Sequence, residues 1–363
     1  MQNTLKIIVA ALIIVGVIIL SSFSLHGLFE EVVPKQKVTS NKGIYITANV
    51  AQSSKMFAAI RSRAKAAGID TFVIDGKSEI SKPLLELLKA KKLSPTTPLQ
   101  ANPWLTKLCQ DLHKEGFIVT VRLVVFKDDR LALARPDLAV HLAGNRLYSD
   151  LKGGLWADPY SDEVQLYNAL IAETAALSGV DEIQFDYIRF PAEARSHNAR
   201  YPALKKGMSR VDTVCAFLET VRTRTQKYNV SLALDIFGVT AWQSKVDIDS
   251  LGQDLKRMAK YLDVICPMLY PSHFHSGYDG FANPGSAPYY FINKGVKQSW
   301  DILSGEATIV IPWIQGFNLR SPNYGPNYIN EQIRGAKEAG SSRYLIWNAR
   351  NDYSVSFNAL HKK

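Results

Sequence analysis

Short apolar runs alternate with amphipathic stretches along the chain from Gly43 onward. Each run is rich in β-branched and aromatic residues, and few show the strict apolar and polar alternation of a one-sided sheet. This is typical of strands that are buried on both faces. The runs predict eight strands, over residues 43–50, 71–77, 117–126, 182–189, 231–238, 263–271, 307–317 and 343–350.

The stretches between these runs repeat their apolar residues at helical spacing. They predict helices over residues 54–68, 83–91, 103–116, 162–178, 210–228, 248–261, 288–303 and 326–340. Strands that alternate with helices run parallel, and eight such units predict one (β/α)8 barrel, the TIM barrel. A doubly wound open sheet is the alternative, but no strand is followed by its G-x-G-x-x-G phosphate loop.

An unbroken apolar run over residues 7–20 follows a short start that contains Lys6. With the weaker positions up to Phe29 it is long enough to span a membrane, although its core alone also suits a cleaved signal peptide. We expect a signal anchor over residues 1–29, a polar linker over 30–42 and the barrel over 43–363. The positive start favours a cytoplasmic amino terminus, so the barrel is expected outside the cytoplasm, in the periplasm or the extracellular space.

Composition narrows the class of protein further. The chain has 363 residues, of which 47% are hydrophobic, and a formal net charge of +10 that is spread along its length. A basic surface of this kind is a weak indication of an acidic partner, and no nucleic-acid-binding motif accompanies it. Cys109, Cys215 and Cys266 lack metal-ligand spacing, so we expect buried thiols, no bound metal and no cofactor.

Polar residues gather where the predicted strands end, which is where a TIM barrel carries its active site. Aspartates end three strands, and aromatic and polar residues end others. The candidate catalytic residues are Asp186 and Asp235; the candidate substrate-binding residues are Asp75, Arg189, Tyr270, His273, Trp313, Gln315, Trp347 and Asn348.

Asp186 and Asp235 end neighbouring strands, and strand alternation places each on the face that looks into the barrel. Parallel strands lie about 4.8 Å apart, so the two carboxyl groups are expected about 5–9 Å apart. Glycosidic bond cleavage needs such a pair, one carboxylic acid to protonate the leaving oxygen and one carboxylate at the developing cation. Arg122, Arg189 or Lys77 could hold Asp186 ionised.

Other roles for these residues stay open. Asp186 could be a buried ion-pair partner of Arg122 or Arg189, and Asp235 could cap a helix or only bind substrate. Asp75 fits a substrate ligand or a structural hydrogen-bonding residue. His273 and His275 could ligate a metal in a metal-dependent hydrolase, but no third ligand accompanies them in the sequence.

Several segments resemble the DUF4015 family of glycosyl hydrolase domains, over about residues 42–350. The most specific is GVDEIQFDYIRFP, at residues 179–191, and the next is CPMLYPSHF, at residues 266–274. The resemblance implies a TIM barrel distantly similar to the α-amylase and α-galactosidase group. It also implies that the aspartate at the end of strand four, here Asp186, is the nucleophile.

The general acid is less clearly implied by the resemblance. An amylase-like acid would map onto Asp235, where that group has glutamate and this chain has the shorter aspartate. An α-galactosidase-like acid would come from strand six, where this chain has no carboxylate before Asp279. We therefore expect an exported, membrane-anchored glycoside hydrolase of the retaining type that acts on an envelope or extracellular polysaccharide. A barrel that binds glycan without cleaving it is the alternative.

Overall fold

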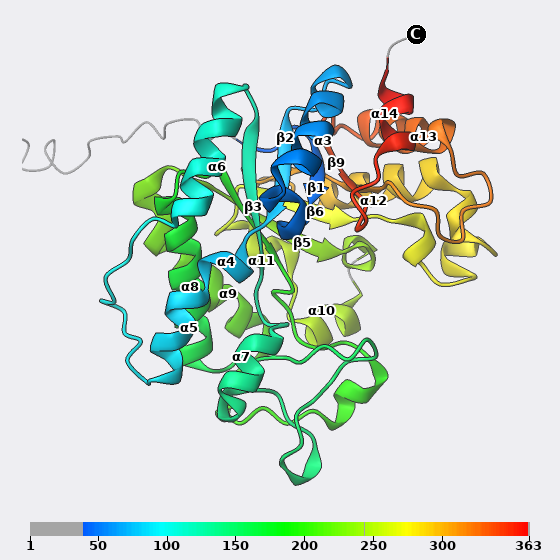
Figure 1. Ribbon diagram of the computed structural model, residues 1–363. Helices are drawn as coiled ribbons and strands as arrows, with labels where there is room; N and C mark the ends of the chain where they lie inside the picture. Colours follow the sequence, from blue (N-terminus) through cyan, green and yellow to red (C-terminus); the bar gives the residue numbers. More distant parts are fainter. Residues whose placement is uncertain (1–38, 243, 362–363) are drawn as a thin grey trace, which may run out of the picture. The chain divides into compact units, whose positions relative to one another are not determined.

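The computed structural model describes residues 39–242 and 244–361, and these form a closed parallel barrel surrounded by helices (Figure 1). The eight-strand barrel confirms the predicted TIM-barrel architecture, because β5 pairs with β6 and thereby closes the sheet. The strands are β1 Lys42–Ile46, β2 Thr71–Asp75, β3 Ile118–Val124, β4 Glu182–Asp186, β5 Ser231–Phe237, β6 Val264–Met268, β7 Ile309–Val310, β8 Trp313–Gln315 and β9 Tyr344–Trp347.

Helices cover the outside of the barrel, with α5, α8 and α9 on one flank and α12 and α13 on another (Figure 1). They are α2 Ala48–Gln52, α3 Ser54–Ala66, α4 Lys77–Ile80, α5 Lys82–Lys89, α6 Pro103–Lys114, α7 Asp129–Ala134, α8 Asp162–Leu177, α9 Arg210–Thr225, α10 Lys245–Leu251, α11 Leu255–Ala259, α12 Pro288–Ile302, α13 Pro326–Glu338 and α14 Ser354–Leu360.

Three predicted elements differ from the structure for local reasons. The seventh predicted strand is split into β7 and β8 around Pro312, which has no N–H to donate to a neighbouring strand. The helix expected over 248–261 is broken after Gly252, whose φ of 76° ends α10 before α11 begins. The first strand stops at Ile46 because Thr47 caps the short helix α2.

The register of neighbouring strands fixes which side chains face each other at the barrel mouth. Gln184 lies opposite Ala233, and Phe185 lies opposite Leu234. Asp186 and Asp235 are the next residues along β4 and β5, toward the carboxyl ends of these strands. The two candidate catalytic aspartates are therefore neighbours across a single strand pair.

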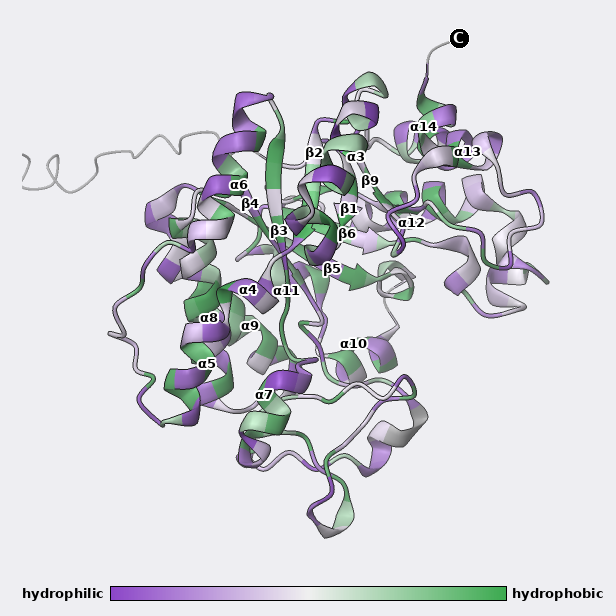
Figure 2. Cartoon of the chain, in the orientation of Figure 1, coloured by the Kyte–Doolittle hydropathy of each residue, from purple (hydrophilic) through white to green (hydrophobic). Residues whose placement is uncertain are grey.

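The barrel strands and the inner faces of the helices supply an apolar core, visible as green ribbons in Figure 2. Cys109, Cys215 and Cys266 are buried free thiols, as expected from their apolar surroundings. A second, smaller cluster fills the barrel interior and contains Trp313 and Tyr270, which brings aromatic side chains up to the mouth.

The chain enters the barrel at its amino-terminal face. Ser40 is buried there, and its hydroxyl donates to Oε1 of Glu182 at 2.5 Å and lies 2.8 Å from the Thr120 hydroxyl. Barrel contacts thus begin just before the boundary expected at residue 43. The expected anchor over residues 1–29 lies outside the described residues. Within residues 39–242 and 244–361, no helix has the length and apolar character needed to cross a membrane.

Two long connections extend the barrel at its carboxyl-terminal end. The segment after β3, residues 125–161, and the segment after β4, residues 187–205, project together below the barrel in Figure 1. Short antiparallel bridges hold this lobe together, including His141 with Arg200 and Lys127 with Trp156. The lobe forms one wall of a cavity at the carboxyl ends of the strands.

Candidate active site

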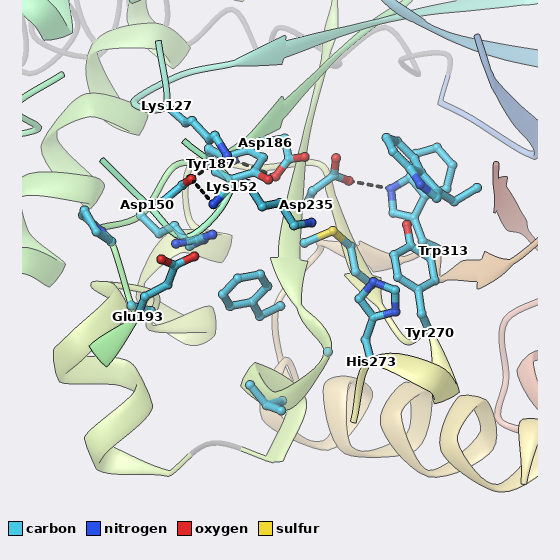
Figure 3. Close-up of a pocket in the computed structure, with 18 of the residues that line it drawn as sticks. Lys127, Asp150, Lys152, Asp186, Tyr187, Glu193, Asp235, Tyr270, His273 and Trp313 are labelled. Carbon is cyan, nitrogen blue, oxygen red and sulfur yellow. Dashed lines mark hydrogen bonds and ion pairs between the residues drawn. The ribbon is translucent and has the colours of Figure 1, made fainter. Parts of the chain in front are cut away.

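The cavity, of about 530 Å³, opens where a TIM barrel places its active site. Figure 3 shows Asp186 and Asp235 between two groups of side chains. Lys127, Asp150, Lys152 and Glu193 lie on one side, and Tyr270, His273 and Trp313 lie on the other. The cavity is therefore acidic at its centre, charged on one wall and aromatic on the other.

Asp186 ends β4 with both carboxylate oxygens engaged. Oδ2 accepts a hydrogen bond from Nη2 of Arg122 at 2.5 Å, and Oδ1 accepts one from the backbone N–H of Tyr187 at 2.7 Å. Tyr187 has a φ of 55°, in the left-handed region that non-glycine residues rarely adopt. This turn of the backbone ends the strand and aims the Tyr187 N–H at the carboxylate. In an unbroken strand, alternation would place Tyr187 on the helix-packing face, whereas here it lines the cavity.

Arg122, on β3, joins the acidic groups of the mouth. Its Nη1 donates to Asp75 at 2.5 Å, its Nη2 donates to Asp186, and its Nε lies 3.8 Å from Oδ2 of Asp235. Burial lowers the pKa of Arg122, but the charges of Asp75 and Asp186 more than offset burial, so its pKa is raised overall. Arg122 is thus the cation beside Asp186. Lys77 instead pairs with Asp128 at 2.7 Å.

Asp235 lies on β5 and is 2% exposed. Its Oδ1 accepts a hydrogen bond from Nε1 of Trp313 at 2.6 Å. Burial raises its pKa well above the usual range of an aspartate, and the negative charge of Asp186 raises it further. Arg122 and the Trp313 hydrogen bond act in the opposite direction without cancelling these effects. Asp186 and Asp235 therefore sit in unequal surroundings, which is how one of two neighbouring carboxyl groups is kept protonated.

The separation of the two carboxyl groups suits glycoside hydrolysis. Both contact the same planar guanidinium, so their nearest oxygens lie no more than about 9 Å apart. Retaining glycosidases hold their carboxyl groups about 5–5.5 Å apart and inverting ones about 6.5–9.5 Å apart, so this limit is compatible with a catalytic pair.

Five of the predicted substrate-binding residues line the cavity: Arg189, Tyr270, His273, Trp313 and Trp347. Trp347 stacks on Tyr45 with ring centroids 4.0 Å apart and packs edge-on against Trp313. His273 lies at the exposed rim, where partial burial and the positive charges of Lys152 and Arg320 lower its pKa. These aromatic faces can stack on the apolar faces of sugar rings.

The other three predicted ligands, Asp75, Gln315 and Asn348, are not among the described residues that line the cavity. Asp75 accepts hydrogen bonds from Tyr45 and Arg122. The Gln315 amide donates to Ser321 and to the Phe317 carbonyl and accepts from the Ser272 N–H.

The Asn348 amide donates to the Gly316 and Asp352 carbonyls, both at 2.7 Å. Like those of Asp75 and Gln315, its polar atoms are therefore already bonded within the protein. All three hold neighbouring loops and strands in place around the site.

The charged wall contains residues that the sequence pattern did not single out: Lys127, Asp150, Lys152, Trp156 and Glu193. They lie in the two long connections after β3 and β4, which have no helical or strand periodicity. For Asp150, Lys152 and Trp156, the signal that could have pointed to them is the long, glycine-containing loop DLKGGLWADPYS at residues 150–161.

A metal site was the remaining alternative for the histidine loop. His275 does not line the cavity, and its Nδ1 lies 2.9 Å from the Ser276 carbonyl oxygen. In the described part of the chain, no three His, Cys, Asp or Glu side chains gather in a way that could hold a metal ion.

Comparison with known proteins identifies the family of the chain. The model of the DUF4015 family, described as "Putative glycosyl hydrolase domain", matches residues 43–353. The chain belongs to this family. The description of this family therefore names glycoside hydrolysis, the same activity that the paired aspartates predict. No curated protein matches the chain.

Solved structures show the same fold as this DUF4015 domain at low sequence identity. The PgaB (BpsB) glycoside hydrolase domain from Bordetella bronchiseptica is 13% identical with a TM-score of 0.59, covering 90% of this chain and 100% of its own. A β-galactosidase from Halorubrum lacusprofundi is 12% identical with a TM-score of 0.56, covering 85% and 52%. The α-galactosidase TtGalA from Thermus thermophilus is 12% identical with a TM-score of 0.51, covering 91% and 64%.

Proposed function

We propose that this DUF4015 domain is a retaining glycoside hydrolase in which Asp186 is the nucleophile and Asp235 is the general acid and base. The observation that carries the proposal is the contrast between the two carboxyl groups. Asp186 is hydrogen-bonded to a guanidinium and a backbone N–H, while Asp235 is buried and its pKa is raised beside it. Two neighbouring groups with opposite protonation are what the reaction requires.

The first step would break the glycosidic bond. Asp235 gives its proton to the glycosidic oxygen, which leaves with the bonding electron pair, while an oxygen of Asp186 bonds to the anomeric carbon. In the second step, ionised Asp235 takes a proton from water. The resulting hydroxide oxygen bonds to the anomeric carbon, and the bond to Asp186 breaks. Two inversions give net retention of configuration.

Arg122 and Trp313 prepare these groups. Arg122 stabilises negative charge on Asp186 before attack and after the glycosyl group leaves. Trp313 fixes one oxygen of Asp235 by its hydrogen bond, and the other oxygen lies 3.8 Å from Nε of Arg122. Tyr270, His273 and Trp347 offer rings at the mouth on which sugars can stack.

We further propose that the substrate is an envelope or extracellular polysaccharide and that the chain is exported. The apolar run over residues 7–29, preceded by Lys6, supports a signal anchor, with a cleaved secreted form as the alternative. Alkaline phosphatase fused after residue 42 should be active if this segment carries the attached enzyme out of the cytoplasm. An inactive fusion present at normal abundance would overturn the export proposal.

The catalytic proposal is tested with aryl glycosides of different sugars and leaving groups. Asp186→Asn should lower kcat by at least about 10³-fold on every substrate that the wild type cleaves. Asp235→Asn should lower kcat nearly as much for substrates with poor leaving groups. It should lower kcat much less for dinitrophenyl glycosides, because dinitrophenolate departs without being protonated. Undiminished activity of Asp186→Asn would overturn the mechanism, and an inverted product anomer in proton NMR would overturn retention.

The alternative of a glycan-binding barrel rests on the aspartate, rather than glutamate, at the end of β5. It predicts that the purified chain retains a polysaccharide but releases no new reducing ends. Turnover on any glycan that is lost in Asp186→Asn would exclude this alternative.

A further inference from the structure

Only some of the charged residues that line the cavity form ion pairs with each other. Four acidic and four basic residues line it, and not every cation has an acidic partner within ion-pair distance. Arg122 is engaged by Asp186, and Lys127 pairs with Asp150 at 2.6 Å. Among the described residues, no carboxylate lies within ion-pair distance of Arg189 or Lys152, so these two cations are left over.

Arg189 is the more informative of the two, because it is only 8% exposed. Its guanidinium stacks on Phe237 at 4.1 Å, on Tyr187 at 4.9 Å and on Trp156 at 5.0 Å. Nη1 donates to the Phe190 carbonyl at 3.0 Å, and within the described structure this is its one hydrogen bond. Arg189 itself lines the cavity.

Arg122 and Arg189 differ in their acidic partners. Both guanidinium groups are buried at the same mouth. Burial lowers the pKa of Arg189 and its neighbours do not restore it, whereas acidic neighbours raise the pKa of Arg122. A buried cation without a paired anion is costly, so a protein that keeps one at the wall of a cavity gains from an anion that enters it.

Lys152 lines the same cavity as Arg189. It is exposed on the loop that covers the cavity, and its charge reaches His273 on the opposite rim. Glu193 accepts a hydrogen bond from the backbone N–H of Leu151 at 2.6 Å. The negative charges of Asp186, Glu193 and Asp150 reach Arg189 from beyond ion-pair distance and only partly offset its burial. Three aromatic rings hold Arg189 in a fixed orientation, which suits a bidentate contact with a planar or tetrahedral oxyanion.

We propose that Arg189 and Lys152 form a subsite for an acidic sugar, and that the substrate is a polysaccharide bearing carboxylate or sulfate groups. This rests on the proposed function in so far as the cavity binds a glycan. Tyr187 links the two sites, because it follows the nucleophile Asp186 and its ring faces Arg189. The acidic group would therefore lie on a sugar next to the cleaved bond. The net charge of +10 would draw such a polymer toward the protein.

The test measures binding of the full-length chain to polygalacturonate, hyaluronan and chondroitin sulfate by affinity electrophoresis. Each polymer is compared with its carboxyl-reduced form, and chondroitin sulfate also with its desulfated form. We expect at least one acidic polymer to bind and its neutral counterpart to bind at least about tenfold more weakly. Loss on carboxyl reduction identifies a uronic acid, and loss on desulfation identifies a sulfate ester.

Variants assign the binding to the proposed residues. Arg189→Gln should weaken binding about tenfold or more, Lys152→Gln several-fold, and Arg189→Lys less than Arg189→Gln. Lys245→Gln removes one charge from exposed α10 and should bind as the wild type does. If Arg189→Gln fails to fold, Lys152→Gln, at an exposed position, carries the test.

Equal binding of acidic and neutral polymers, binding of none, or equal effects of Lys152→Gln and Lys245→Gln would overturn the subsite. Reducing-end release is measured in parallel. Cleavage of neutral glycans alone would refute the acidic subsite and leave the proposed hydrolase intact. Selective binding of acidic polymers without any cleavage would support the acidic subsite and refute the proposed hydrolase.

Discussion

The indole N–H of Trp313 donates to Oδ1 of Asp235 at 2.6 Å, across the gap between β8 and β5. Both side chains are buried, so this hydrogen bond is shielded from water. It favours the ionised form of Asp235 and opposes the burial that raises the pKa of this carboxyl group. Trp313 thus limits how far the pKa of the proposed acid rises.

Trp313→Phe should therefore raise the pKa of Asp235 further. Asp235 acts as an acid in its protonated form, so activity falls as pH rises through its pKa. Without the indole N–H, the alkaline limb of the kcat/KM profile should move to higher pH, and kcat should fall about tenfold. Trp347→Phe is the matched control, because Trp347 packs against Trp313 but makes no hydrogen bond to Asp235. A limb that moves to lower pH in Trp313→Phe would contradict this role.

Arg122→Met should reduce both stability and activity. It removes the partner of Asp75 and Asp186 and leaves two carboxylates facing each other with less compensation. Loss of one member of a buried ion pair costs about 3–5 kcal/mol, to be measured by urea unfolding. We also expect kcat to fall at least about 10²-fold. Arg61→Met breaks the more exposed pair with Glu115 and should cost less than about 1 kcal/mol. Equal losses in the two variants would argue against a special role for Arg122.

Glu182, at the amino-terminal face of the barrel, should make stability depend on pH. Burial raises its pKa to about 7, against 4.5 for an unperturbed glutamate. The folded state keeps this proton while the unfolded state releases it. The stabilisation is therefore complete below about pH 4.5 and is lost as pH rises through about 7, by about 3 kcal/mol in total.

Glu182→Gln should remove this dependence, so the free energy of unfolding should fall less between pH 4.5 and 7.5 than in the wild type. Urea unfolding at several pH values measures it. Glu219→Gln changes an exposed glutamate on α9 and should leave the wild-type slope unchanged. An unaltered slope in Glu182→Gln would show that another group titrates.

Gly238 lines the cavity directly after β5. We expect it to tolerate no side chain, because its neighbours leave no room for a Cβ. A Cβ at this position would lie 2.6 Å from the Met268 carbonyl oxygen and 3.1 Å from the Phe274 ring. Gly238→Ala should push β5 away from β6, cost about 1–3 kcal/mol and lower activity by displacing Asp235. In Gly325→Ala the new Cβ meets nothing within 4 Å, and both properties should be retained. Wild-type activity of Gly238→Ala would show that this strand end can shift freely.

The barrel was predictable because its strands are buried on both faces and therefore read as continuous apolar runs. Asp186 and Asp235 could be placed toward the barrel mouth from strand alternation alone, and both line the cavity. Alternation failed one residue later, at Tyr187, because a left-handed backbone turn interrupts the strand. Such a turn depends on contacts around the strand end, so the alternation of side chains along the strand does not predict it.

Partners that are distant in sequence account for the other differences. Gln315 lies at a strand end, as expected, but Ser272, Ser321 and Gln332 use its polar groups. Lys152 and Trp156 reach the cavity through a loop with no periodic pattern. Local patterns report which face a residue is on, whereas the choice between ligand and scaffold depends on contacts made only after folding.

The hydrogen bonds of Ser40 with Glu182 fix the face at which the chain enters the barrel. The chain joins the barrel at the face opposite the cavity. A support coupled to this face, at Thr39 or Ser40, would leave the opening of the cavity free. Coupling at these residues therefore suits assays on insoluble polymers.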